Sequence, residues 1–106
     1  MNLHALLSAR ADNPIRVGLI GGGKFGAMFL AQARRTPGLH VAAIADLNLP
    51  RAREQLARLG WPESVSGARD LEDALSRRTV WLTEDSGKLI ADPRIEVLIE
   101  IGRAHV

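Results

Sequence analysis

The chain has 106 residues, enough for one small domain whose core would bury roughly two-thirds of the unfolded surface. Its 46% hydrophobic and 25% charged content is typical of globular proteins, and its formal net charge is only +2. Four aromatic residues and no long basic run argue against nucleic-acid binding. The sequence has no cysteine and no apolar run near the ~20 residues of a membrane span, so we expect a cytoplasmic protein without a membrane partner.

Residues 1–14 are predicted to form a short helix and a lead-in to the first strand. Leu3, Leu6 and Leu7 follow helical spacing, and Asp12-Asn13-Pro14 then interrupts the pattern. The segment lacks the charged start and the long apolar stretch of a secretion signal. We therefore do not interpret it as a secretion signal.

A glycine-rich turn follows the first predicted strand, which is apolar and covers residues 15–20. The turn reads Gly21-x-Gly23-x-x-Gly26 and opens into a helix predicted over residues 24–35. In a dinucleotide-binding turn, the first glycine permits the tight bend and the second lets the pyrophosphate approach the backbone. The third lets the helix pack closely on the strand. The N–H groups at the start of the helix would then bind the phosphates.

Two side chains within this turn complete its candidate cofactor-binding residues. Lys24 could help to neutralise the phosphates or could simply be exposed, because the backbone does most of the phosphate binding. Phe25 begins an apolar helix face that continues through Met28 and Phe29. We expect that face to pack mainly on the sheet.

A second apolar strand, predicted over residues 41–45, ends at a carboxylate. An almost wholly apolar strand is typical of a parallel sheet covered on both faces. The carboxylate, Asp46, stands twenty positions after Gly26 and could accept both hydroxyls of an adenosine ribose. Arg51 and Arg53 follow closely, where an enzyme that selects NADP places an arginine against the extra phosphate. Because a carboxylate repels that phosphate, we predict NAD as the cofactor and keep NADP as the alternative.

The rest of the chain alternates helices and strands. The order βαβα(α)βαβ predicts α/β class, namely the first half of a Rossmann-type, doubly wound parallel sheet. Trp61 and Trp81 are interpreted as packing residues. The remaining elements expected are a helix over residues 51–59 begun by Asn48-Leu-Pro50, a loop over 61–67, a short helix capped by Asp70, a strand over 79–83, a helical turn capped by Thr83, and a last strand over 95–99.

The glycine turn and its surroundings resemble a known family. The stretch from Pro14, Pro-Ile-Arg-Val-Gly-Leu-Ile-Gly-x-Gly-Lys-Phe-Gly-x-Met-Phe-Leu-Ala-Gln, is similar to bacterial NAD(P)-dependent oxidoreductases of the homoserine-dehydrogenase-like kind that carry a SAF domain. The ending, Leu89-Ile-Ala-Asp-Pro-Arg-Ile-Glu-Val-Leu-Ile-Glu100, resembles the same family and, more loosely, the glucose–fructose oxidoreductase family. The resemblance covers residues 1–100 and is specific in the first 46. Gly22 departs from it, because alanine is expected there.

The resemblance implies an activity and a domain organisation. Residues 15–100 would be a partial NAD(P)-binding Rossmann domain, with a nicotinamide dinucleotide at the glycine turn and Asp46 on its ribose. The full-length protein would be an oxidoreductase, and a homo-oligomer, transferring hydride between the cofactor and a small carbonyl or hydroxy substrate. Its substrate and proton-transfer groups would lie in a later domain, so no catalytic residue is assigned, and no metal site is predicted. We expect the 106-residue chain alone to bind dinucleotide weakly and to be inactive.

The last residues are expected to be foreign to the protein. Glu100-Ile-Gly-Arg-Ala-His-Val106 is what the codons GAG ATC GGA AGA GCA CAC GTC would encode, and that string resembles a widely used sequencing adapter. We therefore interpret residues 101–106 as a non-native tail. A genuine polar tail is the alternative.

Two other functions stay open. A non-enzymatic module that binds NAD(H) and reports its redox state to a partner would share every feature of residues 15–100. An S-adenosylmethionine-dependent methyltransferase also uses a glycine turn and an acid after its second strand. Its glycines usually stand closer together, and its first strand usually carries an acid, which residues 17–20 lack. The methyltransferase is therefore the weaker alternative.

Overall fold

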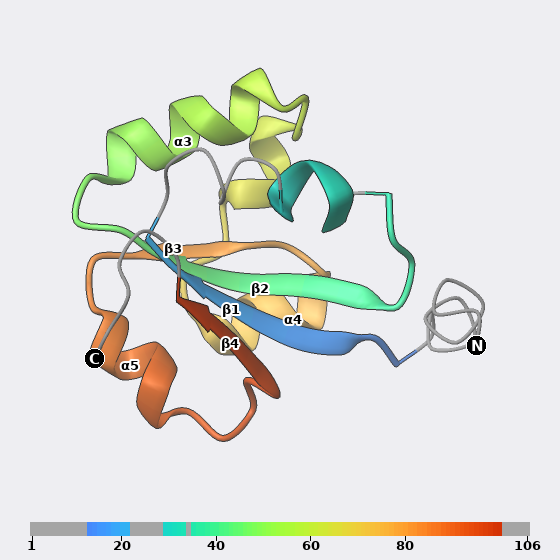
Figure 1. The fold of residues 1–106 in the computed structure, drawn as a ribbon, viewed down its shortest axis with the longest axis vertical. Helices are drawn as coiled ribbons and strands as arrows, with labels where there is room; N and C mark the ends of the chain where they lie inside the picture. Colours follow the sequence, from blue (N-terminus) through green and yellow to red (C-terminus); the bar gives the residue numbers. More distant parts are fainter. Residues whose placement is uncertain (1–12, 22–28, 34, 101–106) are drawn as a thin grey trace.

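Four strands form one all-parallel sheet in the computed structural model, which describes residues 13–21, 29–33 and 35–100. The order across the sheet is β3-β2-β1-β4 (Figure 1). The predicted α/β class with a parallel sheet is thereby confirmed. The strands are β1 (Ile15–Ile20), β2 (Leu39–Ala45), β3 (Trp81–Thr83) and β4 (Val97–Glu100).

Helices cover both faces of this sheet (Figure 1). Residues 29–33 are helical and pack with α3 (Leu49–Arg58) on one face, whereas α4 (Leu71–Arg77) and α5 (Ser86–Ala91) pack on the other. A short 3₁₀ helix, η1 (Glu63–Ser66), joins α3 to α4 within the segment predicted as a loop. None of the helices in the described part of the chain is long and apolar enough to cross a membrane.

The core consists of two apolar clusters, one on each face of β2. Ala42 and Ala43 are fully buried, which confirms the prediction that this strand is covered on both sides. Its register against β1 shifts once, from Val17 opposite Val41 to Gly18 opposite Ala43, so Ala42 forms a bulge. The cluster towards α3 contains Leu19, Leu30, Ala33, Val41, Ile44, Leu56, Val80 and Leu82, and that towards α5 contains Ala42, Ala43, Ala45, Leu71 and Leu89. Trp61 packs partly buried on the first and Trp81 on the second, as predicted.

The signals that predicted α3 act as expected. The Asn48 side chain caps the helix by accepting a hydrogen bond from Arg51 N at 3.1 Å, and Pro50 lies in the first turn. Gly60 follows the helix with φ of 81°, a left-handed conformation that favours glycine at a helix end. The helix buries Leu56 against the sheet as predicted, and Leu59 packs partly buried beside it.

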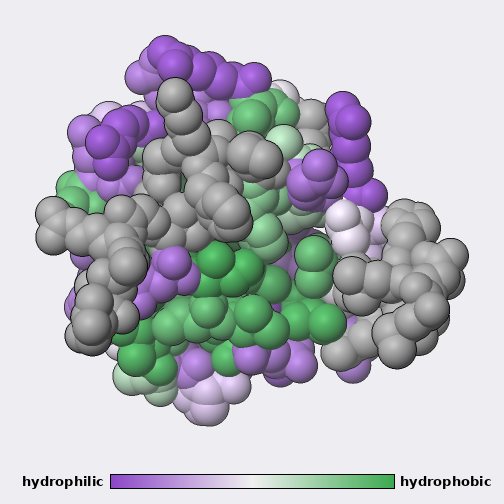
Figure 2. Space-filling view, viewed as in Figure 1, coloured by the Kyte–Doolittle hydropathy of each residue, from purple (hydrophilic) through white to green (hydrophobic). Residues whose placement is uncertain are grey.

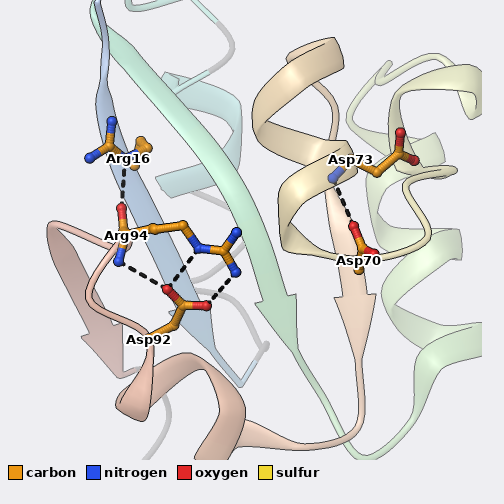
Figure 3. Close-up of polar contacts among 5 residues, drawn as sticks. All are labelled: Arg16, Asp70, Asp73, Asp92 and Arg94. Atoms are coloured by element: carbon orange, nitrogen blue, oxygen red, sulfur yellow. Dashed lines mark hydrogen bonds and ion pairs between the residues drawn. The ribbon is translucent and has the colours of Figure 1, made fainter.

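Asp70 caps α4, as predicted, and its removal should cost stability. Its Oδ1 accepts a hydrogen bond from Asp73 N at 2.7 Å (Figure 3). Asp70→Ala leaves that N–H without its partner, so we expect a loss of about 1 kcal/mol in the free energy of unfolding, measured by urea denaturation. Asp70→Asn keeps an acceptor oxygen and is the matched control. A loss as large for asparagine as for alanine would contradict the capping role.

Two details around β3 differ from the sequence-based expectation. The strand predicted over 79–83 begins at Trp81, because the two residues before it bond elsewhere. Thr79 N donates to the Ala74 carbonyl in α4, and Val80 N donates to the Val65 carbonyl in η1. Thr83 does not cap the next helix. Instead, Asp85 caps α5 by accepting a hydrogen bond from Lys88 N. Thr83 is still in the sheet, and its hydroxyl accepts a hydrogen bond from Asp85 N.

The last strand begins at Val97 instead of residue 95, and a compact ion pair leads into it. Arg94 donates to both carboxylate oxygens of Asp92, at 3.0 and 2.8 Å, while Arg16 Nε on β1 donates to the Arg94 carbonyl at 2.6 Å (Figure 3). Glu96 N then bonds to the Arg16 carbonyl at 2.9 Å and starts the pairing with β1. The hydrogen bond from Arg94 lowers the pKa of Asp92 below its ordinary value.

His40 makes stability depend on pH. Its Nε2 donates to the Thr79 carbonyl at 2.7 Å, and burial, together with Arg78 and Arg16, lowers the pKa of the imidazole below the ordinary 6.5. The folded protein therefore binds this proton less readily than the unfolded chain does. Stability contributed by neutral His40 is present above pH 6.5 and is lost as pH falls below it.

This dependence can be measured with urea midpoints at about pH 7.5 and about pH 5.5, a range above the titration of ordinary carboxylates. We expect a lower midpoint at the lower pH. His40→Gln retains a donor for the Thr79 carbonyl but does not titrate, so the difference between the two midpoints should shrink. An unchanged difference would show that another group causes the effect.

Candidate functional site

The carboxyl ends of β1, β2 and β3 meet at one edge of the sheet, and short backbone bonds hold them together. Gly21, directly after β1, donates its N–H to the Ala45 carbonyl at 2.8 Å. Asp46, directly after β2, donates its N–H to the Thr83 carbonyl at 2.9 Å. The glycine and the carboxylate that the sequence pattern singled out are therefore brought to the same edge. In open α/β sheets, ligands bind at this edge.

Gly21 has the backbone conformation that the predicted turn requires. Its φ is 85°, in the left-handed region that side chains other than glycine rarely adopt. The first glycine of the motif therefore has a structural reason to be glycine. The predictions for Gly23, Lys24, Phe25 and Gly26 fall outside the described residues, as do those for 1–12 and 101–106.

The Asp46 side chain is almost buried and held in a fixed position. It is 5% exposed, and its Oδ1 accepts from Asn48 N at 2.9 Å and from Arg51 Nη2 at 3.3 Å. The first contact is a local turn that orients the carboxylate, and the second is an ion pair. Arg51 itself is 64% exposed, so its guanidinium reaches Asp46 from the solvent side. Arg53 is also exposed but lies on another part of α3, away from this carboxylate.

A depression of about 350 Å³ lies over these strand ends. It contains three of the predicted cofactor-binding residues, Gly21, Asp46 and Arg51. It is also lined by Leu47, which follows Asp46, and by Glu84 and Ser86, which follow β3. The sequence analysis missed all three of these residues. Their position within three residues of the end of a parallel strand could have identified them, because such strands end at a shared edge. Ile20 and Ala45 complete the lining.

The chemistry of this depression is that of a polar binding site. It offers a fixed carboxylate, an exposed guanidinium, a second acid and an exposed leucine. These groups can accept hydrogen bonds from hydroxyls or amines and can neutralise an anion. In the described part of the chain, no three acidic or histidine side chains stand close enough together to hold a metal ion.

A larger depression, about 630 Å³, lies elsewhere, on the α4–α5 face, and its charged lining is partly paired. It includes Trp81, Lys88 and the Asp92–Arg94 ion pair. Lys88 and Asp85 are candidates for proton transfer only by residue type. Lys88 lines this larger depression, whereas Asp85 caps α5, and neither lines the depression at Asp46. Neither is therefore assigned a catalytic role.

Comparison with known protein families finds no model that matches this chain. Comparison with curated proteins likewise finds no significant match. The geometry of the depression at Asp46 is therefore the basis for assigning a function.

Proposed function

We propose that residues 15–100 bind the adenosine half of a nicotinamide dinucleotide, as the first half of a Rossmann-type, doubly wound sheet. The protein to which they belong would be an NAD(P)-dependent oxidoreductase of the homoserine-dehydrogenase-like kind. It would transfer hydride between the cofactor and a small carbonyl or hydroxy substrate. The cofactor supplies the hydride chemistry, and the residues described here supply binding and orientation.

One observation carries the proposal: Gly21 and Asp46 line the same depression at the ends of adjacent parallel strands. A dinucleotide needs these two features together, because the pyrophosphate lies at the first strand-to-helix turn and the ribose lies at the end of the second strand. A flexible glycine turn without a ligand would not require an orientated, almost buried carboxylate beside it.

The strand order supports the doubly wound interpretation. The chain builds β1, β2 and β3 in one direction and then returns to place β4 on the other side of β1. Such a reversal is where nucleotides bind in open parallel sheets. The β4 edge also exposes apolar side chains, Val97 at 43% and Leu98 at 40%, with Ile90 of α5 at 62%. Apolar residues gather on the face of the molecule that Figure 2 shows, as expected if further elements cover it.

NAD is the preferred cofactor in this proposal. The Asp46 carboxylate would accept ribose hydroxyls and would repel a 2′-phosphate. Arg51 already bonds to Asp46 at 3.3 Å, so recruiting its guanidinium to a phosphate would require this ion pair to break. NADP binding is therefore possible but weaker.

Ligand binding to the 106-residue chain tests the proposal directly. NAD, NADP and S-adenosylmethionine would each be titrated while unfolding is followed by tryptophan fluorescence. A ligand at ten times its dissociation constant adds about 1.4 kcal/mol to the free energy of unfolding. We expect stabilisation by NAD, less by NADP and none by S-adenosylmethionine. Gly21→Val, which forces a β-branched residue into a left-handed conformation, should remove the response to NAD.

Two outcomes would contradict the proposal. Stabilisation by S-adenosylmethionine alone would replace the oxidoreductase proposal with a methyltransferase. No stabilisation by any of the three, in a chain shown by circular dichroism to be folded, would remove the nucleotide site.

A further inference from the structure

We propose that the base of the bound nucleotide lies between Leu47 and Glu84, with Leu47 packing on its face and Glu84 accepting a hydrogen bond from the exocyclic amine of adenine. This inference rests on the proposed function and extends it from the ribose to the base. It concerns two residues on different strand ends that line one depression with Asp46.

Leu47 is the most exposed large apolar residue in the described part of the chain, at 88%. A single exposed leucine is common on protein surfaces and would mean little by itself. This one directly follows the orientated Asp46 and lies on the wall of the same depression. A ribose bound by Asp46 carries its base on the adjacent carbon, so an apolar surface beside the carboxylate is where the base would be. Packing against a purine would shield the leucine from water.

Glu84 lies at the other strand end that lines the depression, directly after β3, and no contact within the described residues occupies its carboxylate. The acid next to it, Asp85, caps α5 by accepting from Lys88 N, and Thr83 bonds to the backbone. Within the described residues, Glu84 makes no hydrogen bond or ion pair, although it lines the depression. An ionised carboxylate only accepts hydrogen bonds. The group of adenine that donates them is its 6-amino group.

The informative ligand is an NAD analogue in which hydrogen replaces the 6-amino group, because it keeps the purine face and adds no bulk. For the native chain we expect this analogue to bind about tenfold more weakly than NAD, the ratio that corresponds to about 1.4 kcal/mol. In Glu84→Ala the ratio of the two dissociation constants should fall to about one, because NAD binds more weakly while the affinity for the analogue is unchanged. Glu72→Ala, which removes an exposed glutamate on α4 outside the depression, should retain the native ratio.

Leu47→Ala tests the apolar contact separately. It should weaken NAD and the analogue by the same factor, about fivefold, because packing on the purine face does not depend on the amine. Dissociation constants for both ligands and all four proteins can be measured by calorimetry at one salt concentration.

Failure of this inference is distinguishable from failure of the proposed function. If NAD binds the native chain but Glu84→Ala retains the native preference for the amine, Glu84 does not read the base. If Leu47→Ala binds both ligands as tightly as the native chain does, the base lies elsewhere. If NAD does not bind at all, both the proposed function and this inference are overturned.

Discussion

Asp46→Ala is expected to weaken NAD binding by about a hundredfold or more, and NADP binding by much less. Two ribose hydroxyls would lose a charged acceptor, and each such hydrogen bond contributes about 1.5 kcal/mol or more. For NADP, the same change removes a carboxylate that repels the 2′-phosphate. It also releases Arg51 from the 3.3 Å contact, so the guanidinium can bind the phosphate instead. Calorimetric titration with both cofactors measures the two changes.

A matched control is Asp92→Ala. Asp92 is likewise a carboxylate bonded to an arginine, Arg94, but it lies on the α5–β4 connection outside the depression at Asp46. The Asp92→Ala substitution should change the affinity for neither NAD nor NADP. Asp46→Asn adds a second comparison, because it keeps an oxygen for Asn48 N while removing the charge. Equal losses of NAD and NADP in Asp46→Ala would show that Asp46 does not select between them.

The sequence predicted those parts of the fold that depend on local signals. The span of β1 and the burial of β2 follow from mostly apolar runs, which are typical of parallel strands covered on both faces. Asn48, Pro50 and Gly60 mark the ends of α3 through their own backbone and side-chain chemistry. Gly21 and Asp46 were identified because a nucleotide turn fixes both their spacing and their place on adjacent strands.

The errors arise where competing local signals or distant contacts decide the structure. Thr83 and Asp85 are both residue types that cap helices well. Asp46 N donates to the Thr83 carbonyl from 37 positions away in the sequence, and this bond retains Thr83 in the sheet. Leu47 and Glu84 carry no motif, and only the parallel pairing of β2 with β3 brings them to one depression. Which strands pair with each other cannot be read from the residues of a single sequence.

Leu19→Ala is expected to be the most destabilising of the substitutions considered, at about 3 kcal/mol. Leu19 lies in the central strand β1, is 0% exposed, and belongs to the cluster that holds residues 29–33 and α3 against the sheet. The truncation removes buried methyl groups and leaves a cavity that β1 cannot close, because β2 and β4 flank it on both sides. Urea denaturation followed by circular dichroism measures the loss.

Ile90→Ala is the control of similar size on the surface. Ile90 is 62% exposed on α5, so its truncation should change the free energy of unfolding by less than about 0.5 kcal/mol. A domain of this kind is stable by only about 5 to 15 kcal/mol, so a loss of about 3 kcal/mol should lower the urea midpoint of the Leu19 variant clearly below that of the Ile90 variant. Comparable losses for both variants would mean that the described core does not exist in solution. In that case the edge that carries Gly21 and Asp46 would not be assembled either.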